Sequence, residues 1–85
     1  MQHHIYYIKY ALRFAPMQIP ELVTLFNAQV QNRGWSSMRA YHDKALIDEF
    51  TRRGINVTAV HNGKSTSFAQ PVRYDLKDNK LIVIN

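Results

Sequence analysis

The stretch His4–Phe14, HIYYIKYALRF, decides the fold, because its apolar residues fit two different periods. One parity holds only apolar and aromatic side chains: Tyr6, Ile8, Tyr10, Leu12 and Phe14. This period-2 pattern, rich in strand formers, predicts a β-strand. The same stretch also places Ile5, Ile8 and Leu12 at helical spacing. We therefore expect a strand and keep a short helix as the alternative.

A helix is expected after this stretch, because Pro20 suits a first helical turn and Glu21 beside it complements the helix dipole. Its apolar stripe consists of Ile19, Leu22, Val23, Phe26 and Val30. The helix should end near Arg33, with Gly34 as a left-handed residue and Trp35 packing back on the helix.

A second helix is expected to begin at Ser36 or Ser37, because either hydroxyl can cap a first turn. It should end at Arg53, where Gly54 supplies the left-handed residue and the chain folds back on the helix.

Residues 61–67 read HNGKSTS, which is similar to the end of a phosphate-binding loop. A Walker-type loop needs a glycine five residues before its Gly-Lys pair, and Thr58 occupies that position. Asn62-Gly63 is instead a strong hairpin signal, because a type I′ turn requires positive φ at both central residues. We therefore predict a hairpin in which His61 faces Lys64.

A second hairpin is expected from Val72–Leu76 and Lys80–Asn85, with Tyr74 opposite Val83. The segment Leu81–Ile84 is apolar on both faces of such a strand. Because a strand of this kind is usually covered on both faces, we expect it inside the sheet or at a contact between two copies of the chain.

These elements predict one α+β domain over residues 1–85, with two helices packed on a small antiparallel sheet in the order β-α-α-β-β-β. If His4–Phe14 is a helix, the alternative is a winged-helix arrangement of three helices followed by a wing. Ser36–Arg53 would then be the recognition helix.

The balance of charge favours a polyanionic partner. Eleven Lys+Arg against six Asp+Glu give a net charge of +5. Asp48 precedes Arg52 by four residues, and Glu49 precedes Arg53 by four residues. We expect these carboxylates to form ion pairs that neutralise part of the positive charge of the second helix. We expect other cations and their polar neighbours to contact nucleic acid: Lys9, Arg13, His61, Lys64, Ser65 and Arg73.

The leading hypothesis is thus a small nucleic-acid-binding accessory protein, of the kind that phages and other mobile elements encode, with catalysis not expected. The chain has no cysteine, which excludes disulfides and thiolate metal sites and makes the cytoplasm the expected location. The four histidines lack the spacing of metal ligands, and we expect no metal and no cofactor. The N-terminal stretch is interrupted by Lys9 and Arg13 and is too short to span a bilayer, so no membrane partner is expected.

The stretch Arg73–Ile84, RYDLKDNKLIVI, resembles the closing hairpin of toxins of the ribosome-dependent RNase and gyrase-poison superfamily. The resemblance implies a small basic protein built from a strand, two helices and a sheet, and it makes an endoribonuclease toxin an alternative function. The base and the cationic groups would come from one cluster: His61, Lys64, Arg73 and Tyr74. The basic and histidine residues that such ribonucleases carry after the last strand have no counterpart in this sequence.

A third hypothesis is a protein-interaction module that forms a homodimer. It follows from the two apolar faces of Leu81–Ile84 and from the aromatic first segment, which one small domain covers with difficulty.

Overall fold

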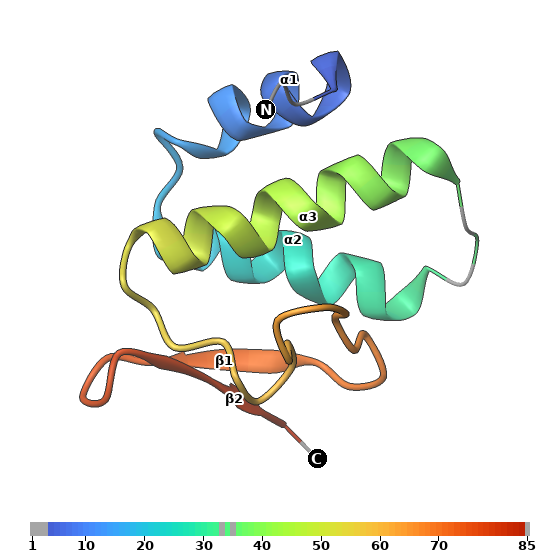
Figure 1. Cartoon of the computed structure of the whole chain (residues 1–85). Helices are drawn as coiled ribbons and strands as arrows, with labels where there is room; N and C mark the ends of the chain where they lie inside the picture. The colour runs from blue at the N-terminus through green and yellow to red at the C-terminus, as the bar shows by residue number, and fades with distance from the viewer. Residues whose placement is uncertain (1–3, 33, 35, 85) are drawn as a thin grey trace.

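The computed structural model describes residues 4–32, 34 and 36–84. Its elements, in chain order, are α1 (Ile5–Phe14), α2 (Ile19–Gln31), α3 (Ser37–Arg52), β1 (Val72–Asp75) and β2 (Lys80–Val83) (Figure 1). The predicted α+β class is confirmed. The predicted first strand is wrong, because that segment is the helix α1, and the described part of the chain is ordered α-α-α-β-β.

Burial against α3 explains why α1 is a helix. His4 caps it by accepting a hydrogen bond from the backbone N–H of Tyr6 at 3.1 Å. The helical turn then directs Tyr10 and Phe14 toward the core, where Phe14 is 1% exposed. A strand would have buried Leu12 on the same side as Phe14, and Leu12 is 71% exposed. Local preference left both structures open, and packing against α3 selects the helix.

α2 begins close to the predicted residue. Pro20 lies in its first turn, and the Glu21 side chain accepts a hydrogen bond from the backbone N–H of Gln18 at 3.0 Å. The helix ends at Gln31. The expected cap involving Trp35 follows Arg33, and both of these residues lie outside the described part of the chain.

α3 begins and ends as the sequence predicts. The Ser36 hydroxyl accepts a hydrogen bond from the backbone N–H of Arg39 at 3.1 Å. At the other end Gly54 has a φ of +78°, and Ile55 donates its N–H to the carbonyl of Phe50 at 3.0 Å. This is the predicted left-handed cap.

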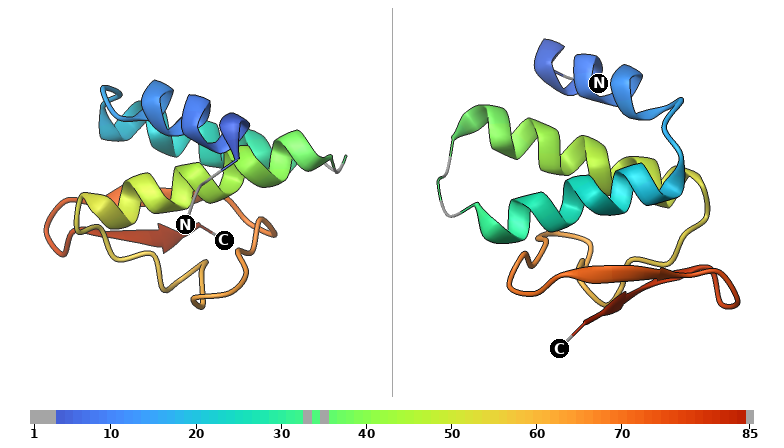
Figure 2. Two further views of the ribbon diagram at one scale, coloured as in Figure 1. Left: turned by 45° about the horizontal axis from the view of Figure 1, so that its top comes forward. Right: turned by 180° about the vertical axis from the view of Figure 1, so that it is seen from behind.

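The fold has three layers, with the α2 and α3 pair in the middle (Figures 1 and 2). α1 lies on one side of α3, and the strands with their connecting loops lie on the other side of the pair. The largest fully buried side chains come from all three layers: Phe14, Leu22, Phe26, Leu46, Phe50, Val72 and Leu81.

β1 and β2 form an antiparallel pair with Val72 opposite Val83 and Tyr74 opposite Leu81. The predicted register, with Tyr74 opposite Val83, is wrong by two residues, because Leu76 lies in the turn instead of in the strand. A shift of two keeps each side chain on its predicted face. Leu81 is accordingly buried, whereas Ile84 is 41% exposed.

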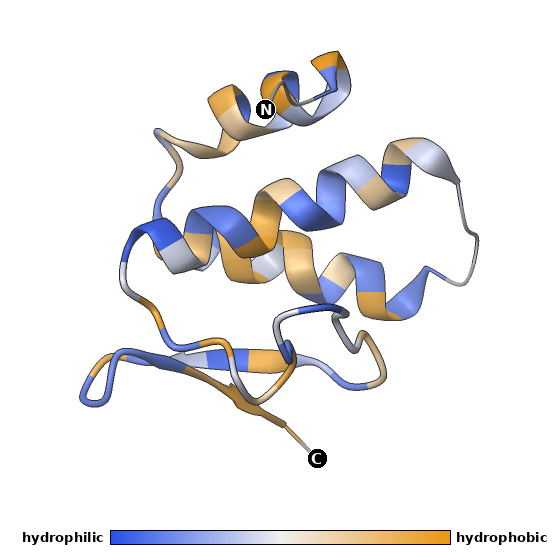
Figure 3. Ribbon diagram, in the orientation of Figure 1, coloured by the Kyte–Doolittle hydropathy of each residue, from blue (hydrophilic) through white to orange (hydrophobic). Residues whose placement is uncertain are grey.

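Figure 3 shows the end of β2 as a continuous hydrophobic segment. Its outer edge is partly covered, because Leu81 donates its N–H to the carbonyl of Asn56 at 2.9 Å. Asn56 and Lys80 form an isolated bridge. Apart from this contact and a bridge at His61, residues 55–61 do not form the first strand of the hairpin that was predicted around Asn62-Gly63. The homodimer through Leu81–Ile84 remains a prediction.

The Asn27 side chain joins the middle layer to the sheet. Its amide accepts a hydrogen bond from the N–H of Val72 at 2.8 Å and donates one to the carbonyl of Val72 at 2.9 Å. The amide therefore satisfies both edge groups of Val72 as a neighbouring strand would.

The winged-helix alternative matches the order of three helices and a hairpin, and α3 as its recognition helix remains a prediction. The C-terminal half of α3 is buried at Leu46, Ile47, Glu49 and Phe50. A recognition helix must present a face to the groove of DNA. α3 packs against α1 on one side, and its exposed residues include Ser37, Ala40, Lys44, Thr51 and Arg52.

Candidate functional site

The HNGKST loop (residues 61–66) closes on a bridge between His61 and Thr66, whose Nδ1 and Oγ1 atoms lie 2.8 Å apart. The turn is therefore two residues longer than predicted, and the expected facing of His61 and Lys64 is wrong. Of the Asn62-Gly63 pair only Gly63 has a positive φ, of +93°, so the turn is not type I′.

Asn62 organises this loop. Its Oδ1 accepts hydrogen bonds from the backbone N–H groups of Lys64 and Ser65, each at 2.9 Å. Successive backbone N–H groups of this kind bind anions in phosphate-binding loops. Because Asn62 occupies them here, contact with an anion falls to the exposed side chains of Lys64 and Ser65.

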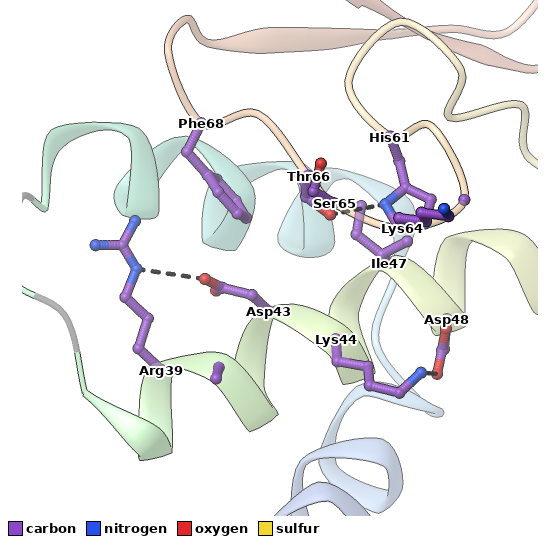
Figure 4. Close-up of a pocket in the computed structure, with 12 residues that line it drawn as sticks. Arg39, Asp43, Lys44, Ile47, Asp48, His61, Lys64, Ser65, Thr66 and Phe68 are labelled. Atoms are coloured by element: carbon purple, nitrogen blue, oxygen red, sulfur yellow. Dashed lines mark hydrogen bonds and ion pairs between the residues drawn. The ribbon is translucent and has the colours of Figure 1, made fainter.

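A cleft of about 800 Å³, the loop cleft, lies between the HNGKST loop and α3 (Figure 4). On the α3 side, Arg39 pairs with Asp43 at 3.3 Å and Lys44 pairs with Asp48 at 3.2 Å. These charges cancel in pairs. Of the described Lys and Arg residues that line the loop cleft, Lys64 alone has no ion pair. Lys64 therefore makes the net charge of the cleft lining positive.

Arg39 is a structural residue of this wall. Its guanidinium donates to the carbonyls of Gln29 at 3.0 Å, Asn32 at 2.5 Å and Gly34 at 2.6 Å. The last carbonyls of a helix have no partner within the helix. Arg39 supplies a hydrogen-bond donor to the carbonyls at the end of α2, so its guanidinium is not free to bind a ligand.

The structure divides the six predicted contact residues into three groups. One group lines the loop cleft: His61, Lys64 and Ser65. Lys9 and Arg13 are exposed on α1, which lies across α3 from the sheet layer (Figure 1). Arg73 is exposed on β1.

The cluster required by the ribonuclease alternative is divided in the same way. Arg73 and Tyr74 line a groove of about 530 Å³ between β1 and the start of α2. His61 and Lys64 line the loop cleft, which shares no residue with that groove. General acid–base chemistry needs its groups within hydrogen-bond reach of one substrate. The two linings do not form one such site.

Ion pairing separates two kinds of cation. On α3 the predicted pairing of Asp48 with Arg52 is wrong, because Asp48 binds Lys44 and Glu49 binds both Arg52 and Arg53. Every Lys and Arg of α3 therefore has a carboxylate partner. Within residues 4–32, 34 and 36–84, the cations without an ion pair lie on other elements: Lys9, Arg13, Lys64, Arg73 and Lys77.

Glu49 is a buried charge at the end of α3, 5% exposed. Burial alone would raise the pKa of its carboxyl. Hydrogen bonds from Arg52 and Arg53 and the charges of both outweigh burial and hold the pKa of Glu49 below its usual value. Arg53 also donates to the carbonyls of Phe14 and Met17, at 3.2 and 2.6 Å, so this group fastens the end of α1 to α3.

Tyr7 fastens the other end of α1, because its hydroxyl donates to Asp48 at 2.5 Å. Burial, the hydrogen bond to Asp48 and the negative charge of Asp48 together raise the pKa of Tyr7 to about 12. Asp48 also pairs with Lys44 at 3.2 Å, and the side chains of Lys44 and Asp48 are 60% and 41% exposed. α1 lies beside this pair, and Lys44 lies 5.6 Å from the ring centroid of Tyr7.

The side chains of His42 and Asp43 are largely buried, at 12% and 15% exposed. The His42 ring meets Tyr10 and Phe14 edge to face, with centroids 5.1 and 5.2 Å apart. It therefore packs between α1 and α3. The described residues contain no group of three or more His, Asp or Glu side chains arranged to hold a metal ion.

The outer face of α1 was not among the predicted sites, although the first segment was expected to be hard for one small domain to cover. Ile5, Ile8 and Leu12 form one stripe there, which we call the α1 seam, and they are 61%, 44% and 71% exposed. The signal was present, because these three residues were the ones that fitted helical spacing. Reading the segment as a strand concealed that a helix would leave them uncovered.

Comparison of the chain with protein-family models, with curated proteins and with solved structures gave no significant match. No helix formed by the described residues is long and apolar enough to cross a membrane.

Proposed function

We propose that this protein binds single-stranded nucleic acid, mainly through contacts to phosphate. The observation that supports this most is the division of its cations. The net charge of +5 is carried largely by exposed side chains that have no carboxylate partner among the described residues. An unpaired Lys or Arg side chain can contact a phosphate directly, whereas the charge of a paired one is largely neutralised by its carboxylate.

An exposed group of aromatic rings beside Lys9 favours a single strand over a duplex. The rings of His4 and Tyr41 stack at 4.2 Å and 13°, and Tyr6 lies 5.2 Å from His4. Lys9 lies 5.9 Å from the centroid of Tyr6, which is 39% exposed. Unpaired bases stack on aromatic side chains of this kind while nearby cations hold the phosphates.

We do not propose that the protein recognises base sequence in duplex DNA through α3. The Lys and Arg residues of α3 are all paired with carboxylates, and one side of its C-terminal half is buried in the core. The unpaired cations lie on α1 and in the sheet layer, on both sides of the middle layer (Figure 1). A flexible strand can follow such a surface, whereas a straight duplex touches one side of a small domain.

The test is fluorescence anisotropy with labelled single-stranded DNA, single-stranded RNA and duplex DNA of about 20 nucleotides. We expect both single strands to bind more tightly than the duplex at about 50 mM salt, with affinity falling steeply by about 200 mM. Failure of every nucleic acid to bind about 10 µM protein at the lower salt concentration overturns the proposal.

Two double variants locate the contacts, and a third is their control. Lys9→Ala with Arg13→Ala, and Lys64→Ala with Arg73→Ala, should each lower the slope of log affinity against log salt by about two. Lys44→Ala with Arg52→Ala removes the same charge from exposed but paired positions. It should change the slope by less than half as much. Equal losses in all three variants would show that only net charge matters, which contradicts a defined contact surface.

A further inference from the structure

The α1 seam is an apolar stripe that nothing in the described chain covers. Tyr7, Tyr10 and Phe14 fill the opposite side of the helix and pack on α3 or in the core. Ile5 and Leu12, at 61% and 71% exposed, are among the most exposed large apolar residues of the described chain. Grouping of such side chains on one helix face marks a surface that a partner covers.

The spacing of the seam suits another helix. Ile8 follows Ile5 by three residues, and Leu12 follows Ile8 by four. This is the alternation that places side chains on the contact line of two packed helices, where each enters a hole between residues of the facing helix. α1 is already held on α3 by Tyr7 and by the Glu49–Arg53 group, so the seam is presented on a rigid support.

The charge beside the seam selects the kind of helix. Lys9 adjoins Ile8 and Arg13 adjoins Leu12, and α1 contains no acidic residue. Neither cation has an ion pair within the described residues. A facing helix with Glu or Asp along one edge of its apolar stripe would pair with both, as charges beside the contact line do in coiled coils.

A second copy of this chain fits the seam poorly. Two antiparallel α1 helices would bring Lys9 near Lys9 of the other copy, and like charges there are destabilising. Three aliphatic side chains also offer only about 60–120 Å² each. That is well below the roughly 800 Å² per partner of a stable interface, so the pair would need favourable charges that it does not have.

We infer that the α1 seam is a docking site for an amphipathic helix of another protein, one with an acidic edge that meets Lys9 and Arg13. The small area makes this a weak and readily reversible contact. The inference does not require the binding of nucleic acid, and because both ligands would use Lys9 and Arg13, a bound helix and a bound strand should compete for α1.

The test uses the full chain and a designed three-heptad peptide with an Ile/Leu seam flanked by Glu. One comparison peptide keeps the seam and carries Lys in place of Glu, and a second keeps Glu and replaces the seam with Gln. Titrations followed by NMR should show the first peptide bound at least about tenfold more tightly than either other, a difference of about 1.4 kcal/mol. The shifted resonances should lie on α1.

Variants of exposed residues sharpen the test without touching the core. Leu12→Gln should reduce binding of the Glu-flanked peptide at least about fivefold, while circular dichroism and thermal melting stay unchanged. Lys9→Glu with Arg13→Glu should reverse the preference, so that the Lys-flanked peptide binds more tightly. Lys77→Ala, an unpaired cation of the sheet hairpin, is the control and should change neither.

Several results would overturn the inference. They are equal binding of the Glu-flanked and Lys-flanked peptides, equal binding of the Gln-seam peptide, resonance shifts away from α1, or no binding at millimolar peptide. Light scattering that shows a dimer lost in Leu12→Gln would assign the seam to a second copy. Binding to vesicles of anionic lipid that Leu12→Gln abolishes would assign it to a membrane surface.

Discussion

α1 and α3 pack against each other, but they use their side chains in opposite ways. α3 buries Leu46 and Phe50 completely and pairs each of its cations with a carboxylate. α1 buries Phe14, leaves the seam residues exposed and has no carboxylate for Lys9 or Arg13.

The difference shows how a small domain divides its work. The core is assembled by α2, α3 and the sheet, and α1 closes it with one face only. Because about one face suffices to hold a helix in place, the other face of α1 is free of structural demands. Exposed apolar and unpaired charged groups can persist there if they serve binding, whereas on α3 they would be costly.

The largest test of this comparison removes one large side chain from each helix. Phe50→Ala should lower the free energy of unfolding by about 3–5 kcal/mol, because Phe50 is 0% exposed in the core. Leu12→Ala should change it by less than about 0.5 kcal/mol. Urea denaturation followed by circular dichroism measures both. A large loss for Leu12→Ala would mean that the seam is covered in solution, which contradicts the docking inference.

A smaller effect is expected from Glu49→Gln, which removes the buried carboxylate between Arg52 and Arg53. Because hydrogen bonds to a charged group are lost, the free energy of unfolding should fall by about 2 kcal/mol at neutral pH. The native pKa of Glu49 lies below the ordinary value of 4.5, so its stabilising contribution is present above pH 4.5 and is lost as the pH falls through the native pKa.

The Glu49→Gln variant should therefore lose less stability than the wild type between neutral and acidic pH. Asp78→Asn is a suitable control, because Asp78 is exposed and its contact with Lys80 is 4.0 Å long. Parallel acid-induced losses in the wild type and in Glu49→Gln would show that Glu49 is not held as the structure indicates.

Tyr7→Phe should have a smaller effect, about 1 kcal/mol, because it removes one hydrogen bond between α1 and Asp48. The pKa of Tyr7 is raised from 10.0 to about 12 in the native state. Its contribution is complete below pH 10 and is lost as the pH rises from 10 to 12.

Ultraviolet absorbance of the phenolate checks this directly. One of the five tyrosines should titrate near pH 12 in the folded wild type, and this late transition should be missing in Tyr7→Phe. If the late transition persists in the variant, Tyr7 is not the buried phenol.

Local signals in the sequence predicted the parts of this fold that local chemistry determines. Ser36 caps α3 and Gly54 ends it as expected, because a hydroxyl acceptor and a residue that tolerates positive φ act within a single turn. Both turns were located, but the first is closed by a single bridge and not by paired strands, and each turn proved two residues longer than expected. Turn length depended on interactions such as the Asn62 side chain with Lys64 and Ser65, which the Asn-Gly signal does not contain.

The element that was wrong depended on a distant partner. The residues of α1 satisfy both periods, and only packing against α3, about thirty residues further along, selects the helix. The candidate site was affected in the same way. Composition selected Lys9, Arg13, Lys64 and Arg73, which all lack ion pairs in the described chain. It could not show that these residues lie on three separate parts of the fold, and their contact with nucleic acid stays a prediction.

The smallest effects on stability are expected when one lysine is removed from α3 or from α1. Lys44→Ala breaks an exposed pair with Asp48, and Lys9→Ala breaks none, so each should change the free energy of unfolding by less than about 0.5 kcal/mol. Their effects on nucleic-acid binding should differ. Lys9 can release a counterion from a phosphate, so Lys9→Ala should lower the slope of log affinity against log salt by about one. Because Lys44 is already paired with Asp48, Lys44→Ala should lower this slope by clearly less. Anisotropy titrations at four or more salt concentrations give both slopes, and equal slopes for the two variants would remove the distinction between paired and unpaired cations on which the proposed function rests.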